Sequence, residues 1–227
     1  MKLLKESELD WSPVVANSRM NRQRNASGIN SYEQEFKFRP EIFLETKATE
    51  NGHASWMDLC CGEGRALLQT AIYFQQQQLQ DVVSLNGIDL LDSFISVPGN
   101  ISCLEFQSMS LLKWMPEQRY DLITCVHGLH YIGDKMGLVE IAVNALNPGG
   151  LFIANFDLNN VVINNNDAGV YLKRAFKELD IDYNQRSKIL RYTGAGNVSF
   201  KISYVGADDT HGPNYTGQDS VTSHYTT

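Results

Sequence analysis

Short apolar runs alternate with amphipathic stretches from Ser55 onward. Between the runs, apolar residues recur at the spacing of a helix face, as at Leu67, Leu68 and Ala71. This alternation is typical of a parallel sheet covered by helices on both faces. The apolar runs have ordinary strand lengths and predict strands at 55–60, 82–89, 101–107, 120–126 and 151–156.

The pattern changes after the fifth predicted strand. A helical stripe ends near Leu179, and two strand-like runs then lie on either side of Gly194-Ala195-Gly196-Asn197, which predicts a hairpin. Within 198–204 apolar and polar residues alternate, as expected for an antiparallel strand. We therefore expect an α/β fold with a doubly wound, mostly parallel sheet of seven strands that ends in an antiparallel hairpin strand.

The segments on both sides of this core differ from it in composition. Residues 1–50 have mostly helical patterns, and Pro40 is well placed as the first residue of a helix that runs toward Lys47. Residues 206–227 are rich in Gly, Thr, Ser and Asp, which predicts a loose polar tail, either free or lying against the core. With 227 residues, we expect one domain: an N-terminal helical cap (1–50), a core (51–205) and the tail.

Charge and hydropathy exclude several partners. The formal net charge is -7, which repels phosphate backbones and disfavours a nucleic-acid partner. Basic residues concentrate at Arg19, Arg22 and Arg24, where asparagines separate them, and the favoured interpretation is a solvated helix face. No stretch approaches the roughly 20 apolar residues of a membrane span, and the N-terminus resembles no signal peptide. We expect a cytoplasmic protein without membrane contact.

The cysteines indicate buried, reduced thiols. Cys60, Cys61, Cys103 and Cys125 lie in apolar, strand-like contexts, and no pair has the two-residue gap of a Cys-x-x-Cys site. We expect no metal site.

A loop rich in small residues, Asp58-Leu59-Cys60-Cys61-Gly62-Glu63-Gly64, follows the first predicted strand and opens a helix. Such a loop lets backbone amides approach a ligand closely. The dinucleotide fingerprint requires a third glycine, but Leu67 stands there, and Asp58 would repel a pyrophosphate. A cofactor that carries an ammonium and a sulfonium is favoured instead.

The segment resembles the first motif of the class I S-adenosylmethionine-dependent methyltransferases, acidic-x-Gly-x-Gly-x-Gly, with Cys60 in place of the first glycine. The resemblance implies a Rossmann-like sheet and S-adenosylmethionine as cofactor. It also implies cofactor contacts from the residues of this motif, namely Asp58, Leu59, Cys60, Gly62 and Gly64.

The resemblance extends over residues 55–205. In Gly87-Ile88-Asp89-Leu90 it implies that Asp89 binds both ribose hydroxyls and that Leu90 packs on adenine; the alternative for Asp89 is a strand-end cap of a turn. An acidic residue that often binds the adenine amino group is replaced by Ser108-Met109, so a hydroxyl or a backbone carbonyl must substitute. Val126 and His127, after the fourth strand, are expected to form a wall of the cofactor site.

Histidines after the fourth strand resemble those of family members that act on small molecules. His130 and His127 are candidate bases for a hydroxyl or acid acceptor, because an unperturbed imidazole titrates near neutral pH. The alternative is that they satisfy loop backbone groups, and His127 is more readily a cofactor-wall residue than a base. The segment lacks the Asn-Pro-Pro-Tyr type of sequence of base aminomethylases.

Substrate and cap residues are harder to assign. In the resembling family, helices ahead of the core often cover the cofactor, which suggests Tyr32 with Arg22 or Arg24; an Arg there would grip a carboxylate bidentately. Tyr131 and Asp157 follow strands and are further candidates. The Asn-rich stretch 159–167 contacts a polar acceptor or is a plain polar loop.

The sequence thus predicts an S-adenosylmethionine-dependent methyltransferase that acts on an O or N atom of a small molecule. Two alternatives remain. The first is a non-catalytic protein that binds S-adenosylmethionine or scaffolds a partner, and the second is an NAD-dependent oxidoreductase.

Overall fold

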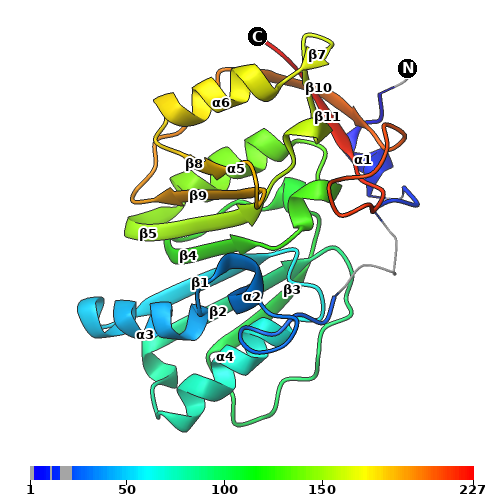
Figure 1. Ribbon diagram of the computed structural model, residues 1–227. Coiled ribbons are helices and arrows are strands. Elements are labelled where there is room, and N and C mark those ends of the chain that lie inside the picture. Colours follow the sequence, from blue (N-terminus) through cyan, green and yellow to red (C-terminus); the bar gives the residue numbers. More distant parts are fainter. Residues whose placement is uncertain (1–2, 11, 16–21) are drawn as a thin grey trace.

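A seven-stranded sheet organises the chain (Figure 1). The computed structural model describes residues 3–10, 12–15 and 22–227. The strands follow the order β3-β2-β1-β4-β5-β9-β8; β1 to β5 are parallel, and β9 is antiparallel to β5. This confirms the prediction of a mostly parallel sheet. The strands are β1 (Ala54–Leu59), β2 (Val83–Asp89), β3 (Leu104–Ser108), β4 (Tyr120–Cys125), β5 (Leu146–Asn155), β8 (Asp182–Asn184) and β9 (Ile189–Thr193).

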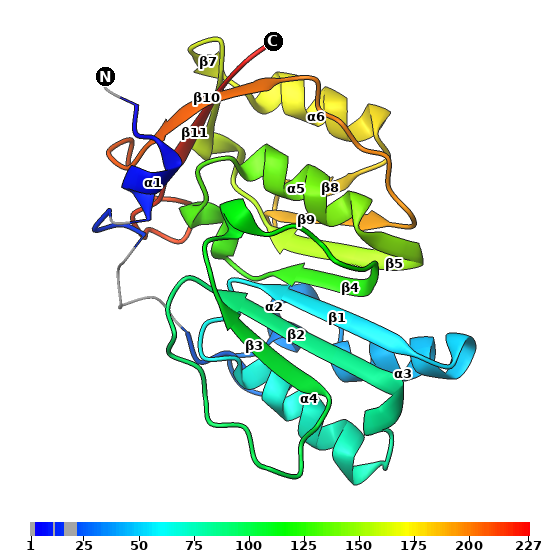
Figure 2. The ribbon, with the colours of Figure 1, turned by 180° about the vertical axis from the view of Figure 1, so that it is seen from behind.

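Helices cover both faces of the sheet (Figures 1 and 2). Because successive side chains of a strand point to opposite faces, Trp56 packs in one buried cluster and its neighbour Met57 in the other. The first cluster includes residues of α2 (Tyr32–Phe36), α3 (Pro40–Asn51) and α4 (Arg65–Gln76), and the second includes residues of α5 (Lys135–Asn144) and α6 (Gly169–Glu178). Short 3-10 helices lie at Gln80–Val82, Leu111–Lys113, Gly128–Tyr131 and Leu158–Asn160.

The terminal hairpin differs from the prediction. It consists of β8 and β9, and its turn is held by Asn184, whose Oδ1 accepts from the amides of Arg186 and Ser187. The turn expected at 194–197 is therefore wrong, and residues 198–202 form no strand. The amide of Val198 donates to Asn144 Oδ1 on α5, so a side chain replaces the missing strand partner. Alternate apolar residues here fill the space between helices.

A second sheet of four strands gathers distant segments, in the order β10-β11-β6-β7. Its strands are β10 (Ser203–Asp208), β11 (Thr222–Thr226), β6 (Val161–Ile163) and β7 (Asn166–Asp167). The tail is therefore not loose, because β11 lies between β10 and β6. The Asn-rich stretch 159–167 supplies β6 and β7 and does not line the cavity described below. Near the N-terminus, α1 (Glu6–Leu9) follows a bridge between Leu4 and Ala207.

The N-terminal segment is only partly helical. α3 begins at Pro40, as predicted, and ends at Asn51. Residues 22–31 form turns instead of a helix, tied by the amide of Tyr32 donating to the carbonyl of Asn25. Arg19 lies outside the described residues. The prediction of a mostly helical cap is thus wrong for 22–31.

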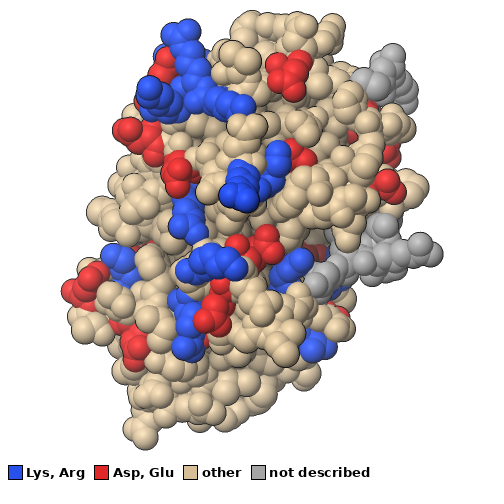
Figure 3. Space-filling model, in the orientation of Figure 1, with Lys and Arg blue, Asp and Glu red and all other residues tan. Residues whose placement is uncertain are grey.

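Two surface properties bear on the expected partners. None of the helices within 3–10, 12–15 and 22–227 is both long and apolar enough to cross a lipid bilayer. On the face that Figure 3 shows, the described Lys and Arg side chains are interleaved with Asp and Glu.

Tyr225 on β11 joins the tail to α5 through its hydroxyl. Removing that hydroxyl tests whether the tail stabilises the fold. Its buried hydroxyl accepts from the amide of Met136 at 2.9 Å and donates to Asp134 Oδ1 at 3.0 Å. We expect Tyr225→Phe to lower the free energy of unfolding in urea by about 1–3 kcal/mol, because a buried amide loses its partner. Tyr192→Phe on β9 is the control. Equal effects of the two variants would contradict the anchoring role.

Candidate functional site

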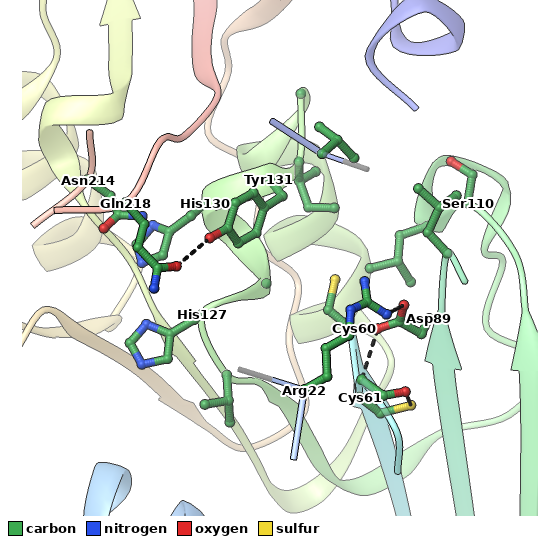
Figure 4. Close-up of a pocket in the computed structure, with 18 of the residues that line it drawn as sticks. Arg22, Cys60, Cys61, Asp89, Ser110, His127, His130, Tyr131, Asn214 and Gln218 are labelled. Atoms are coloured by element: carbon green, nitrogen blue, oxygen red, sulfur yellow. Dashed lines mark hydrogen bonds and ion pairs between the residues drawn. The ribbon is translucent and has the colours of Figure 1, made fainter. Parts of the chain in front are cut away.

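A cavity of about 390 Å³ lies at the carboxyl ends of β1, β2 and β4, within the size range of small-molecule sites. Figure 4 shows its two ends. One end is lined by Arg22, Cys60, Cys61, Gly62, Asp89, Leu90, Met109 and Ser110. The other is lined by His127, His130, Tyr131, Asn214, Tyr215 and Gln218, and Arg24, Tyr32, Glu35 and Val126 are further lining residues.

The loop after β1 has the conformation that its motif requires. Gly62 and Gly64 have positive φ angles of 64° and 77°. A Cβ on Gly62 would lie 2.7 Å from the carbonyl oxygen of Arg22, and one on Gly64 would lie 2.2 Å from the ring of Phe106. Cys60, which replaces the first glycine of the motif, has a φ of 57° and so adopts the left-handed conformation at an energetic cost. Cys60 and Gly62 line the cavity, whereas Gly64 does not.

Asp58 lies beneath this loop and does not line the cavity. Its carboxyl is fully buried and accepts hydrogen bonds from the hydroxyl of Tyr32 at 2.7 Å and from Thr124 Oγ1 at 2.6 Å. Desolvation raises the pKa of Asp58 to about 7, although both hydrogen bonds act in the opposite direction. Leu59 is also fully buried and outside the lining. The direct cofactor contacts expected of Asp58 and Leu59 are therefore not available in this structure.

Asp89 at the end of β2 faces the cavity and joins three segments. Its Oδ2 accepts from the amide of Gly62 at 2.8 Å, and its Oδ1 accepts from Arg22 Nη1 at 2.9 Å and from the amide of Leu91 at 3.1 Å. Arg22 is thus no solvated helix residue, because its side chain is largely buried against Asp89. Leu90 lies beside Asp89 in the lining.

The segment after β3 lines the same end. Met109 and Ser110 face the cavity, but Ser108 does not; its hydroxyl donates to the carbonyl of Leu90 at 3.1 Å. Ser110 in turn donates to Asp10 Oδ1 at 3.3 Å. Asp10, which the sequence did not single out, brings a carboxylate to this end from the N-terminal segment.

His127 pairs with a carboxylate that the sequence did not indicate. Its Nε2 lies 3.3 Å from Glu35 Oε1, and that oxygen also accepts from Asn155 Nδ2 at 2.7 Å. The hydrogen bond with His127 lowers the pKa of Glu35 to about 2 and outweighs its burial. Glu35 stands three residues after Tyr32 on α2, so both side chains reach the cavity from one face of the helix. That spacing is the signal that would have found it.

His130 is buried in the wall of the cavity. Neither ring nitrogen has a hydrogen-bond partner among the described residues, and desolvation lowers the pKa of His130 to about 3. The imidazole is therefore neutral at physiological pH. The ring of Tyr215 lies edge-on to it, with centroids 5.4 Å apart. Tyr131 follows in the wall and donates from its hydroxyl to Gln218 Oε1 at 3.1 Å.

Asp157 holds the C-terminal segment rather than the cavity wall. It is buried outside the lining and accepts from the amide of Tyr215 at 2.9 Å, while Lys188 Nζ lies 3.5 Å from its other oxygen. The segment that it positions supplies four lining residues, Asn214, Tyr215, Thr216 and Gln218. Sequence reasoning missed them because a polar composition without periodicity gives no sign of order.

The raised pKa of Asp58 makes stability depend on pH. The carboxyl of Asp58 binds its proton more tightly in the folded chain than in the unfolded chain, where it titrates near its ordinary value of 3.8. The stability that this proton contributes is therefore complete at low pH and is lost as pH rises toward about 7. We expect the wild-type chain to lose stability relative to Asp58→Asn between pH 4 and 7, by about 1 kcal/mol per pH unit. Chemical denaturation at each pH measures it. Asp81→Asn, at an exposed position, is the control variant, and a difference for Asp58→Asn that stays constant with pH would contradict the assignment.

Several solved structures are similar to this chain. YjhP from E. coli is 20% identical with a TM-score of 0.36, covering 52% of this chain and 49% of its own. Coclaurine N-methyltransferase, bound to N-methylheliamine and S-adenosylhomocysteine, is 16% identical with a TM-score of 0.41; the match covers 58% of this chain and 37% of that protein. N-methyltransferase NodS from Bradyrhizobium japonicum, in complex with S-adenosylhomocysteine, is 14% identical with a TM-score of 0.45, covering 83% and 97%. The chain thus spans half or less of the length of the first two.

The sequence comparisons are of two kinds. Among curated proteins, no sequence matches this chain significantly. The family model described as "Methyltransferase domain" matches residues 29–195, which include the loop after β1, Asp89 and both histidines of the cavity. This match covers well over half of the chain, and the chain therefore belongs to the methyltransferase domain family.

Proposed function

We propose that this protein is an S-adenosylmethionine-dependent methyltransferase that methylates an O or N atom of a small molecule. The observation that supports the proposal best is the continuity of the cavity. It joins the Gly62 and Asp89 end to the His127 and His130 end, as transfer of a group from a cofactor to an acceptor requires. Membership of the methyltransferase domain family agrees with this function.

The residues at the first end fit the cofactor. A Cβ at Gly62 would lie 2.7 Å from the carbonyl oxygen of Arg22, so the glycine is required for the close approach of that backbone, and Gly62 itself lines the cavity. The carboxylate of Asp89 would hold the ribose hydroxyls, and Leu90 and Met109 would flank the adenine. The lining contains three carboxylates, those of Asp10, Glu35 and Asp89, and two guanidinium groups, those of Arg22 and Arg24. This excess of carboxylates favours a ligand with a sulfonium and an ammonium.

At the second end the chain's own groups position the acceptor and take its proton. When bound, S-adenosylmethionine supplies a methyl group on a sulfonium, and the C–S bond breaks with its electron pair going to sulfur as the acceptor's lone pair forms the new bond. The protein must hold the acceptor atom about 3 Å from that carbon. Of the two histidines, we assign the role of base to His127, because its Nε2 lies 3.3 Å from a carboxylate, that of Glu35, which can orient the ring. His130, with its pKa lowered to about 3, is suited to hydrogen bonding instead.

The role of Asp89 is tested by cofactor affinity. We expect Asp89→Asn to weaken the binding of S-adenosylmethionine and S-adenosylhomocysteine by about 10- to 100-fold, since hydrogen bonds to a charged group are worth about 1.5–3 kcal/mol. Isothermal titration calorimetry measures both ligands, with NAD as a third titrant. Asp92→Asn, an exposed neighbour, is the matched control. If only NAD bound the wild-type chain, an oxidoreductase would replace the proposal.

The Glu35–His127 pair is tested by the rate of transfer. With methyl-labelled S-adenosylmethionine and a small-molecule extract of the source cells, we expect Glu35→Gln to lower the rate about 10- to 100-fold, because general-base catalysis contributes about 10²–10⁴-fold and the variant loses only the supporting carboxylate. Cofactor affinity should stay unchanged. Glu33→Gln on the same helix is the control. A rate equal to that of the control would remove His127 from the role of base.

A further inference from the structure

The segment 212–221, between β10 and β11, closes the second end of the cavity. Asn214, Tyr215, Thr216 and Gln218 line the wall there. Its backbone is fixed at both ends, because the amide of Val221 donates to the carbonyl of His130 at 2.8 Å and the amide of Tyr215 donates to Asp157. The segment is therefore a built part of the site.

Tyr215 contributes an aromatic ring to this wall. Its ring centroid lies 5.4 Å from that of His130 and 6.1 Å from that of His127. Its hydroxyl accepts from Asn155 Nδ2 at 3.1 Å, and Asn155 also binds Glu35. The tail residue is thus connected to the Glu35–His127 pair that the proposed function uses as base.

Two polar side chains of this wall are buried without satisfied hydrogen bonds among the described residues. They are His130, at both ring nitrogens, and Asn214, at Nδ2. Asn214 Oδ1 is occupied, because it accepts from the amide of Thr216 at 2.8 Å. A neutral imidazole offers one donor and one acceptor, and the amide nitrogen offers donors only. Buried polar groups of this kind require a partner, and both side chains line the cavity.

These groups discriminate between chemical classes of ligand. A carboxylate has no proton for the imidazole lone pair and is repelled by the nearby ionised Glu35. An ammonium has no lone pair for Asn214 Nδ2. A hydroxyl has one proton and two lone pairs, so it can donate to an imidazole nitrogen and accept from an amide nitrogen.

We infer that segment 212–221 is the acceptor-binding wall and that His130 and Asn214 select a neutral, hydroxyl-bearing acceptor over carboxylates and ammonium ions. The inference rests on the proposed function and narrows its acceptor to this class. The aromatic ring of Tyr215 suits an aromatic scaffold, and Asp157 is a positioning residue for the wall.

The test uses the full chain saturated with S-adenosylhomocysteine, whose binding is first verified by calorimetry. Ligand-observed NMR then measures the affinity of compounds in matched trios, in which one scaffold carries a hydroxyl, a carboxylate or an aminomethyl group. The first trio is benzyl alcohol, benzoate and benzylamine, and a library of planar and aliphatic scaffolds follows. We expect hydroxyl members to bind at least tenfold more tightly than their charged counterparts. Equal binding, a preference for charged members, or no hydroxyl binder in the library would overturn the inference. A chain that does not bind S-adenosylhomocysteine would overturn the proposed function instead.

Asn214→Asp is the sharpest variant. It keeps the Oδ1 that holds the amide of Thr216 but replaces the amide donor with an acceptor, so we expect the preference to move from hydroxyl to aminomethyl members by at least tenfold. Asn184→Asp is the matched control, since Asn184 makes the same kind of turn between β8 and β9 and does not line the cavity. His130→Phe, which keeps the ring without its nitrogens, should remove the hydroxyl preference. Affinity for S-adenosylhomocysteine should stay within about twofold in all three. An unchanged preference in both wall variants would overturn the inference.

Discussion

A carboxyl group without solvent contact stands at the end of the central strand, and the surrounding elements are arranged to satisfy it. Asp58 lies beneath the loop after β1, where Tyr32 from α2 and Thr124 from β4 donate hydrogen bonds to it. Trp56 on β1 donates to the same Thr124, so the network crosses between neighbouring strands. An unpaired buried carboxylate would be costly, and these donors therefore fix where α2 packs. The position of α2 in turn places Glu35 against His127. A structural hydrogen bond made by Tyr32 thereby determines where Glu35, on the same face of the helix, meets the cavity.

The two loops that meet over this network store backbone strain next to the cavity. Cys60 after β1 and His127 after β4 both have φ angles of 57°, a conformation that non-glycine residues adopt at a cost. The two loops pack closely against each other. A Cβ on Gly128 would lie only 2.5 Å from the Cβ of Cys60 and 2.8 Å from the sulfur of Cys125. The left-handed turn at His127 aims its imidazole at Glu35, and the one at Cys60 lets the loop present Gly62 to Asp89. The strained backbone at Cys60 and His127 is thus coupled to the orientation of groups that face the cavity.

At the Gly62 and Asp89 end of the cavity, most of the lining residues were predictable from the sequence. At the other end His127, His130 and Tyr131 were, and the wall formed by segment 212–221 was not. Strand periodicity, the glycine loop and the acidic end of β2 are local signals, and they placed Cys60, Gly62 and Asp89 correctly on the cavity wall. The hairpin was misplaced because alternating residues 198–204 also suit a segment whose backbone is satisfied by side chains of α5. Glu35, Asp10 and Asn214 reach the cavity through contacts between segments far apart in the chain. No local pattern encodes such contacts, and for that reason the sequence left Arg22 open between a solvated face and a cap over the cavity, whereas the structure pairs it with Asp89, 67 positions away.

The order of the tail follows from a charge buried in the core. Lys135, at the start of α5, is almost completely buried, and its ammonium donates to the carbonyl of Val221 at 2.6 Å and to Ser223 Oγ at 3.0 Å. A buried ammonium needs such acceptors, so β11 and the residues before it are required where they lie. Because Val221 also binds the backbone of His130, the segment that satisfies Lys135 is the one that completes the acceptor wall. The wall at 212–221 is therefore built from the tail, whereas the opposite end of the cavity, at Gly62 and Asp89, is built from the ends of β1 and β2.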